Sequence, residues 1–397
     1  MKNLGSVVMS GRAILRLLGR RGPATLAGFA VAACGAGGDV AGPRPVSQVS
    51  FTAVTAGAFH TCGVTTSRAA YCWGANFTGE LGDGTTTPRT NPVLVLGGLN
   101  FAQVSAGDDQ NGNHTCAVTT AGAASCWGNG YSSGTGPVLV AGGLSFAQVS
   151  AGAEHTCAVT TGGAAYCWGS NRSGALGDGT TTDRSSPVSV MGGLGFVQVS
   201  AGRLPFGGHT CGMTTAGGGY CWGSNFAGEL GDGTTTDRRA PVAVMGGLTF
   251  RSLTAGSAHS CGVTGSGAAY CWGLDESGQL GDGSTMTSRS TPVPVLGGLS
   301  FVQVSAGADH TCGVTTSGAA YCWGANTVGQ LGDGTTIARV GPVPVAGRLT
   351  FTSLATGSFH TCAVTSSGPA YCWGLNLSGT LGDGTHTTRT SPVPVVQ

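Results

Sequence analysis

The sequence predicts an all-β protein built from seven copies of one unit, arranged as a propeller or a solenoid. Near copies of the run from His310 to Asp333 recur about every 50 residues, and such a period is typical of repeat architectures. Each copy carries His-Thr-Cys or His-Ser-Cys, then nine residues, then Cys-Trp-Gly, so that the seven tryptophans fall one to a copy.

The spacing of the two cysteines in each unit predicts a β-hairpin. Cys312 and Cys322 are ten positions apart, so an antiparallel fold about Ser317 sets them directly opposite each other. The loop would be residues 316–318, ending in Gly318, which adopts a left-handed conformation without steric cost. Directly opposed cysteines are close enough for a disulfide. We therefore predict seven disulfides within repeats: Cys62–Cys72, Cys116–Cys126, Cys157–Cys167, Cys211–Cys221, Cys261–Cys271, Cys312–Cys322 and Cys362–Cys372.

Two other interpretations of these cysteines stay open. They could be buried and reduced, or His310 and Cys312, which share a strand face, could belong to a metal site. Structural zinc sites usually show short cysteine spacings and four ligands, and neither recurs in the chain. We expect no metal and no cofactor, and interpret the repeated histidine as a hydrogen-bonded residue at the start of a strand.

Four strand candidates recur in each unit when it is counted from its phenylalanine. In the sixth unit they are residues 301–305, 310–315, 319–323 and 342–345, and the last contains proline, which suits an edge strand. Leu-Gly-Asp-Gly lies between the third and fourth candidates in six units. Asp-Gly favours a tight turn, whereas a calcium site needs more carboxylates. The repeats run over 51–100, 101–145, 146–195, 196–249, 250–300, 301–350 and 351–397.

Residues 1–33 have the features of an export signal. Lys2 and four arginines precede an apolar run over 23–33, which is too short to span a bilayer. The following Ala-Ala-Cys-Gly resembles the lipobox of bacterial lipoproteins, so Cys34, which lies outside the repeat pairs, is predicted to carry a lipid. The alternative is an ordinary signal peptide with an unpaired cysteine. Residues 34–50 would form a flexible Gly/Pro-rich tether, and we expect an exported protein anchored by lipid in the cell envelope.

Composition argues against several classes of function. Only 9% of residues are charged and the net charge is +1, so no basic stripe points to nucleic acid. The second and third strands of each unit carry no charge on either side, and such strands must be covered on both faces. A blade wedged between two others meets that requirement. We find no Ser-His-Asp set, recurring carboxylate pair or phosphate loop, and expect no enzyme activity.

The run His-Thr-Cys-Gly-Val-Thr-Thr-Ser-Gly, continued by Tyr-Cys-Trp-Gly-Ala-Asn and Gly-Gln-Leu-Gly-Asp-Gly, resembles the regulator of chromosome condensation repeat family. The resemblance covers about residues 51–397 and implies a seven-bladed β-propeller of four-stranded antiparallel blades. Fold alone does not imply function. The founding member is a guanine-nucleotide exchange factor that uses a wedge-like insertion, and this chain has no insertion longer than four residues. The leader and the paired cysteines fit the exported bacterial branch, of which one member binds an enzyme through one propeller face.

Departures from the repeat indicate a binding face. Repeats 2 and 4 each gain four residues between their first two strands, and repeat 2 loses nine between Trp127 and Pro137. All three changes fall on one face, because alternate loops of a meander share a face, and rigid scaffolds commonly bind through such loops. Neutral drift of the loops is the alternative. The candidate binding residues are Asp108, Asp109, Gln110, Asn111, Arg203, Leu204 and Phe206.

These observations predict an exported, lipid-anchored and monomeric binding module that recognises a protein or a surface glycan. The shortened loop of repeat 2 should leave a notch into which a partner inserts. Membrane contact is expected through the lipid only. The alternatives are an exchange-factor-like regulator, which the family resemblance suggests, and a cryptic propeller enzyme.

Overall fold

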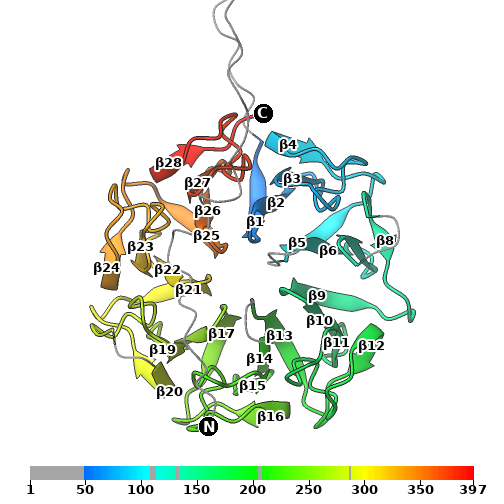
Figure 1. Ribbon diagram of the computed structural model, residues 1–397, viewed down its shortest axis with the longest axis vertical. Helices are drawn as coiled ribbons and strands as arrows, with labels where there is room; N and C mark the ends of the chain where they lie inside the picture. The colour runs from blue at the N-terminus through cyan, green and yellow to red at the C-terminus, as the bar shows by residue number, and fades with distance from the viewer. Residues whose placement is uncertain (1–48, 108–112, 131–133, 204–207, 286–287) are drawn as a thin grey trace, which may run out of the picture. The chain divides into compact units, whose positions relative to one another are not determined.

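The computed structural model describes residues 49–107, 113–130, 134–203, 208–285 and 288–397. Contacts divide the chain into residues 1–45 and 46–397, and all described residues belong to the second unit. In the described residues, 28 strands form seven four-stranded antiparallel sheets set around a ring (Figure 1). The predicted fold class, a seven-bladed β-propeller, is confirmed. No helix of the described residues is long and apolar enough to cross a membrane.

Each blade begins at the phenylalanine of its repeat. The first four blades contain β1 (Phe51–Ala56), β2 (His60–Thr65), β3 (Ala70–Gly74), β4 (Arg89–Leu94); β5 (Phe101–Ala106), β6 (His114–Thr119), β7 (Ala124–Gly128), β8 (Val138–Leu139); β9 (Phe146–Ala151), β10 (His155–Thr160), β11 (Ala165–Gly169), β12 (Arg184–Ser189); β13 (Phe196–Ala201), β14 (His209–Thr214), β15 (Gly219–Gly223) and β16 (Arg238–Ala243). The last three contain β17 (Phe250–Ala255), β18 (His259–Thr264), β19 (Ala269–Leu274), β20 (Ser288–Pro294); β21 (Phe301–Ala306), β22 (His310–Thr315), β23 (Ala320–Gly324), β24 (Arg339–Pro344); β25 (Phe351–Thr356), β26 (His360–Thr365), β27 (Ala370–Gly374) and β28 (Arg389–Pro394). Strand order follows chain order, with the first strand of each blade nearest the centre of the ring (Figure 1).

The central hairpin of each blade has the predicted register. Cys312 of β22 lies opposite Cys322 of β23, and Gly318 has φ +82° in the loop between them. The fourth strand differs from the prediction, because β24 begins at Arg339 rather than at residue 342. A register shift, with the extra residues on β24, sets Gly324 opposite Arg339, and the ion pair of Arg339 described below holds that residue at the strand start.

The structure joins the fourteen repeat cysteines in the seven pairs expected from the spacing, with Cα–Cα distances of 4.0–4.1 Å. All of these cysteines are fully buried. Each disulfide crosses the two middle strands of its own blade and therefore constrains a blade, but it does not tie one blade to the next.

The core consists of apolar clusters between neighbouring blades. In one cluster, Leu280 and Cys261 of blade 5 pack with Phe301 and Trp323 of blade 6. The last blade meets the first in the same way, through a cluster that contains Trp73 and Cys362. Every sheet takes its four strands from one repeat, so the ring closes through packing rather than through a shared strand.

A circuit of side-chain hydrogen bonds runs around the ring beside these clusters. The histidine that opens the second strand of each blade bonds through Nε2 to a hydroxyl of the next blade, at 2.8–3.0 Å. The pairs are His60–Thr115, His114–Thr156, His155–Thr210, His209–Ser260, His259–Thr311, His310–Thr361 and His360–Thr61. Burial lowers the pKa of His259 to about 3 and that of His155 to about 4, so both rings are neutral. The repeated histidine thus has the expected role.

Candidate functional site

The segment between the third and fourth strands of a blade, residues 325–338 in blade 6, is here called the docking loop. It is organised by a buried asparagine. Asn326 donates through Nδ2 to Oδ1 of Asp333 at 3.1 Å and to the carbonyls of Thr335 and Ile337. Its Oδ1 accepts from the backbone N–H of Leu331 at 3.0 Å. Because these bonds lie inside the loop, the loop sets its own shape.

The aspartate of Leu-Gly-Asp-Gly holds the start of the fourth strand. Oδ2 of Asp333 accepts from Nε and Nη2 of Arg339 at 3.0 and 2.8 Å. Burial pushes the pKa of Asp333 upward, but the hydrogen bonds from Thr335 and Arg339 outweigh it and leave the pKa below its ordinary value. Six blades carry this pair: Asp83–Arg89, Asp178–Arg184, Asp232–Arg238, Asp282–Arg289, Asp333–Arg339 and Asp383–Arg389. The arginine six or seven residues after each aspartate was the sequence signal for this role.

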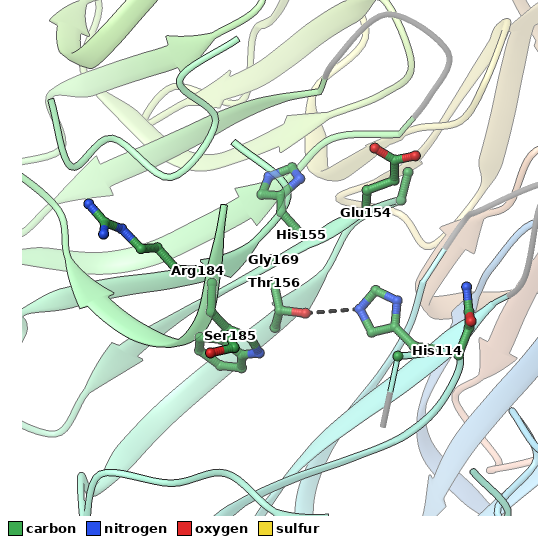
Figure 2. A pocket seen from close by; sticks show the side chains of 11 residues that line it. His114, Glu154, His155, Thr156, Gly169, Arg184 and Ser185 are labelled. Atoms are coloured by element: carbon green, nitrogen blue, oxygen red, sulfur yellow. Dashed lines mark hydrogen bonds between the residues drawn. The ribbon is translucent and has the colours of Figure 1, made fainter. Parts of the chain in front are cut away.

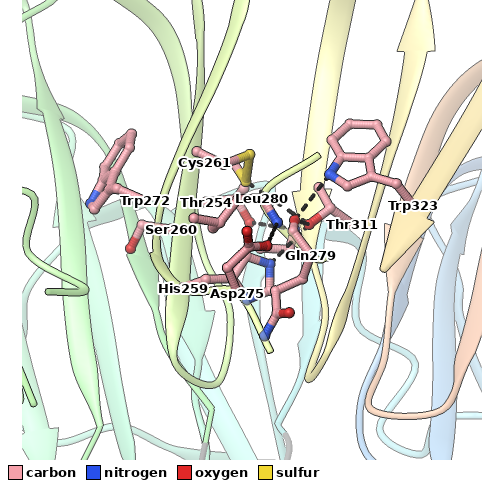
Figure 3. Close-up of a disulfide and its surroundings, with 12 residues drawn as sticks. Thr254, His259, Ser260, Cys261, Trp272, Asp275, Gln279, Leu280, Thr311 and Trp323 are labelled. Atoms are coloured by element: carbon pink, nitrogen blue, oxygen red, sulfur yellow. Dashed lines mark hydrogen bonds between the residues drawn. A yellow bond between two sulfur atoms is a disulfide. The ribbon is translucent and has the colours of Figure 1, made fainter. Parts of the chain in front are cut away.

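In six blades the docking loop reaches over to the next blade. Figure 3 shows this for blades 5 and 6, where the carbonyl of Gln279 accepts from Thr311 Oγ1 at 2.8 Å and from Trp323 Nε1 at 2.9 Å. Leu280 is fully buried in the cluster of Trp323. A Cβ added to Gly281 would lie 2.7 Å from Trp323 Nε1, so the close approach requires glycine.

The same contacts recur at six of the seven interfaces. A threonine or serine hydroxyl donates to the loop carbonyl in Thr115–Glu80, Thr210–Ala175, Ser260–Glu229, Thr311–Gln279, Thr361–Gln330 and Thr61–Thr380, at 2.8–2.9 Å. A loop glycine N–H bonds to the next fourth strand or its start in Gly84–Thr135, Gly179–Arg239, Gly233–Ser290, Gly283–Val340, Gly334–Thr390 and Gly384–Thr90. The buried leucines are Leu81, Leu176, Leu230, Leu280, Leu331 and Leu381.

Within the part of the chain that the structure describes, the interface between blades 2 and 3 is the exception. There the shortened loop of blade 2 leaves a cavity of about 320 Å³ on the surface of blade 3 (Figure 2). Its lining includes His114, Thr156, Trp168, Arg184 and Ser185. Trp168 is 4% exposed, whereas the other six tryptophans are 0% exposed. The notch predicted from the loop length is therefore present.

The notch offers a small set of polar groups. Thr156 Oγ1 is hydrogen-bonded to Nε2 of His114 at 2.9 Å, as the dashed line in Figure 2 shows, and lies 3.7 Å from Cys116 Sγ. The carbonyl of Ser185 occupies the position of the strand carbonyls that accept from a loop glycine at the other interfaces. Arg184 is paired with Asp178 at 2.8 Å. The groups that face the notch are thus mostly neutral and suited to hydrogen bonding with a backbone.

Most of the binding residues predicted from the inserted loops, namely Asp108, Asp109, Gln110, Asn111, Leu204 and Phe206, lie outside the described residues, as does Cys34. Arg203 is described. Its Nη2 donates to the carbonyls of Ala56 and Thr356 at 3.1 and 2.6 Å. These carbonyls belong to the innermost strands of blades 1 and 7, so Arg203 links blade 4 to the opposite side of the ring. Partners 147 and 153 positions away could not be found from the sequence, and a role of Arg203 in binding stays a prediction.

Two docking loops contain a buried carboxyl group with a raised pKa. Burial raises the pKa of Glu229 to about 7 and that of Asp275 to about 6. Asp275 occupies the position of Asn326 and accepts from Leu280 N–H and Ser284 Oγ. Among the described residues, no three His, Cys, Asp or Glu side chains are grouped to hold a metal ion.

Comparisons with known proteins assign the chain to a family. The RCC1-like domain matches residues 135–397, and the regulator of chromosome condensation (RCC1) repeat matches residues 51–80 and 69–118. The chain belongs to the RCC1-like domain family.

Similar proteins have varied activities. Human E3 ubiquitin-protein ligase HERC2 is 31% identical over 291 residues, which are 72% of this chain but 5% of the ligase. The ultraviolet-B receptor UVR8 of Arabidopsis thaliana is 31% identical over 290 residues, 72% of this chain and 55% of the receptor. The chain therefore spans a small part of the ligase and about half of the receptor.

Solved structures show the same fold at low identity. Human WBSCR16 aligns with TM-score 0.73 at 19% identity, over 83% of this chain and 94% of that one. Prp20p from Saccharomyces cerevisiae, described with its binding to Gsp1p and histones, aligns with TM-score 0.71 at 20% identity, over 88% of each chain. The ectodomain of the Arabidopsis thaliana receptor kinase ACR4 aligns with TM-score 0.56 at 20% identity, over 85% of this chain and 100% of that one.

Proposed function

We propose that this protein is an exported binding module that recognises a partner protein at the notch between blades 2 and 3. The observation that carries the proposal is the cavity of about 320 Å³ at the one interface whose docking loop is shortened. A concave site with a few oriented polar groups on a rigid scaffold is the usual form of a binding site. The other six interfaces are filled by the chain itself.

The disulfides support the exported location. Seven disulfides in one chain persist in an oxidising compartment and are rare in the cytosol. The basic leader with its short apolar run supports the same location, and we propose that Cys34 carries the lipid anchor. Cys34→Ser should then release the protein from membranes or block its maturation. Metabolic lipid labelling that is unchanged in this variant would contradict the anchor.

Site-specific crosslinking tests the binding face. A photoreactive amino acid replaces Ser185, which lines the notch, or Ser317, which lies in a hairpin loop on the opposite face. Both variants are expressed in the native host and irradiated in intact cell envelopes. We expect a discrete crosslinked partner from position 185 and none from position 317. Crosslinks from position 317 alone would show that the binding face is the opposite one.

A further inference from the structure

We infer that one face of the propeller lies against an anionic lipid surface, where Arg68 and Arg348 contact phosphate head groups. This face, here called the hairpin face, consists of the hairpin loops between the second and third strands and of the connectors that lead from each blade to the next. The two sets of loops are bonded together, as in the N–H of Thr316 to the carbonyl of Ser300 at 2.9 Å. The inference rests on the anchored location given under the proposed function, and it goes beyond the contact through lipid alone that the sequence predicts.

The chain enters the propeller on the hairpin face, between blades 7 and 1. The N–H of Phe51 donates to the carbonyl of Gly368 in the hairpin loop of blade 7 at 2.9 Å, and the carbonyl of Ser50 accepts from the N–H of Thr66 in the hairpin loop of blade 1 at 3.2 Å. Cys34 precedes Ser50 by sixteen positions, and a Gly-rich chain of this length has an end-to-end distance of about 20 Å. A lipid on Cys34 would therefore keep the entry point, and the hairpin face with it, near the bilayer.

Negative charge is confined to the other end of the strands. Of the 17 Asp and Glu residues, Asp39, Asp108 and Asp109 lie outside the described residues, and the other fourteen all lie in docking loops or in loops between first and second strands. These loops are opposite to the hairpin face, because successive turns of an antiparallel meander alternate between the two ends of the strands. Within the described part of the chain, the hairpin face therefore has no carboxylate to repel an anionic head group.

Arg68 and Arg348 occupy positions that other repeats fill with glycine. Arg68 ends the hairpin loop of blade 1 with φ +67°, where the other hairpins have Gly122, Gly163, Gly217, Gly267, Gly318 and Gly368. Arg348 lies in the connector from blade 6 to blade 7 with φ +53°, where the other connectors have Gly98, Gly143, Gly193, Gly247 and Gly298. Residues other than glycine rarely adopt this left-handed backbone, and such outliers point to a function. An arginine at both positions thus indicates a use for its side chain.

The two arginines flank the entry of the chain. Arg68 belongs to the hairpin loop of blade 1 that bonds to Ser50. On the other side, the carbonyl of Thr350, two residues after Arg348, accepts at 3.3 Å from the N–H of Ser366 in the hairpin loop of blade 7. That loop is the one that also bonds to the entering chain. Both arginines therefore lie beside the point from which the predicted tether leads to the lipid.

The side chains of these two arginines are available to a ligand. Both residues are exposed, and within the described residues neither forms an ion pair, whereas six other arginines are paired with aspartates of the docking loops. A guanidinium group presents its N–H donors in a fork that matches phosphate oxygens. Arg251, at the start of β17, already donates to the carbonyl of Phe301.

The expected contact is weak by itself but sufficient to orient an anchored protein. A basic side chain near an anionic leaflet strengthens binding about fivefold, so two arginines contribute about 25-fold. This attraction is screened over about 8 Å at physiological ionic strength, so high salt should remove it. With the hairpin face against the bilayer, the docking loops and the notch would face away from it, toward a partner protein.

A protein anchored by chemical coupling tests the orientation. The mature chain contains the whole compact unit of residues 46–397. It is coupled through the Cys34 thiol to a maleimide lipid in vesicles, so that the test does not depend on acylation in the cell. A fluorescent amino acid replaces Ser67, in a hairpin loop, or Thr86, in a docking loop, and quenching by a headgroup-labelled lipid is measured. In phosphatidylglycerol vesicles at about 50 mM salt, we expect quenching at position 67 to be at least about twice that at position 86. Phosphatidylcholine vesicles, or about 0.5 M salt, should abolish the difference.

Two matched double variants separate the arginines of the hairpin face from net charge. Arg68→Gly combined with Arg348→Gly installs the glycines of the other repeats and should remove the difference between positions 67 and 86. Arg172→Thr combined with Arg239→Ser removes the same charge from exposed positions on the side of the docking loops. This second variant should preserve the difference. Thermal denaturation with the disulfides intact confirms that each variant is folded.

The outcomes separate the inference from the proposed function. Equal quenching at positions 67 and 86 in phosphatidylglycerol vesicles, stronger quenching at position 86, or a difference that survives the loss of Arg68 and Arg348 would overturn the inference. If crosslinking from position 185 captures a partner but quenching does not differ, the proposed function stands and the inference fails. If lipid labelling is unchanged in Cys34→Ser but position 67 is quenched more strongly, the hairpin face does bind anionic lipid and the native anchor is wrong.

Discussion

The interface of blades 2 and 3 and that of blades 5 and 6 share one framework and differ in one loop. Both have the histidine–hydroxyl bond, His114–Thr156 and His259–Thr311, at 2.9 Å. In blades 5 and 6 a docking loop covers the next tryptophan (Figure 3), and in blades 2 and 3 a cavity lies there (Figure 2). The pairing of β10 with β11 keeps the common register although the loop of blade 2 is shorter. A docking loop of full length is therefore dispensable for forming the next blade.

Acidification should lower the free energy of unfolding more than any change discussed below, because the histidine circuit is common to both kinds of interface. The seven circuit histidines have folded-state pKa values lowered by burial, to about 3 or 4 in six of them. The unfolded chain therefore binds more protons below about pH 6.5, and stability falls as the pH drops from there toward 3–4. The loss approaches ~1.4 kcal/mol per pH unit for each histidine that stays neutral in the folded state.

Guanidinium unfolding between pH 7.5 and pH 5 measures this loss. His259→Gln supplies an amide N–H for Thr311 without titrating, so its stability should change less steeply with pH. A wild-type unfolding free energy that is the same at both pH values would contradict the neutral histidine circuit.

Removing the buried leucine of a docking loop should leave a cavity at an interface that is otherwise filled. Leu176→Ala deletes a fully buried side chain between blades 3 and 4. The expected loss is about 2–5 kcal/mol of unfolding free energy, from lost burial and the cavity left behind. Leu139→Ala in blade 2, where the side chain is 69% exposed, is the matched control and should change stability by less than about 0.5 kcal/mol. Equal losses in both variants would argue against the docking role of Leu176.

A loop-graft variant, in which residues 128–136 are replaced by a copy of residues 169–186, makes the reverse change. It adds a buried leucine and the hydrogen bonds to Thr156 and Ser185 at the open interface, and we expect a gain of about 1–3 kcal/mol. Urea or guanidinium unfolding at pH 7.5 gives the value. A grafted protein that folds but is less stable than the wild type would mean that the surface of blade 3 does not fit a docking loop.

The smallest expected change in unfolding free energy is at the interface of blades 5 and 6, where a carboxyl group organises the docking loop. Asp275→Asn restores the amide found in other loops and removes the cost of ionising a carboxyl group with a pKa of about 6. This cost is absent at low pH and appears as the pH rises above the pKa that the aspartate has in the unfolded chain. We expect a gain of about 1 kcal/mol at pH 8 and a smaller gain at pH 4. A larger gain at pH 4 than at pH 8 would contradict the raised pKa.

Local patterns determined most of the fold. The period, the ten-residue cysteine spacing and the glycine at the hairpin turn define a four-stranded unit from residues close in sequence, as the pairing of Cys312 with Cys322 illustrates. The lost residues of repeat 2 likewise indicated a notch, because a deletion in a regular array removes the same element wherever it falls. The Asp333–Arg339 pair was missed although an arginine six or seven residues after the aspartate is visible in six repeats.

Only the tertiary structure decided how the ring is held together. The bond of Thr210 to Ala175 and those of Arg203 to Ala56 and Thr356 join residues of different blades. Such contacts depend on the curvature of the closed ring, which sets one blade against the next and has no signature in local sequence. The sequence alone specified the blade, because its strands pair within about 50 residues; the contacts between blades appeared only when seven blades were assembled.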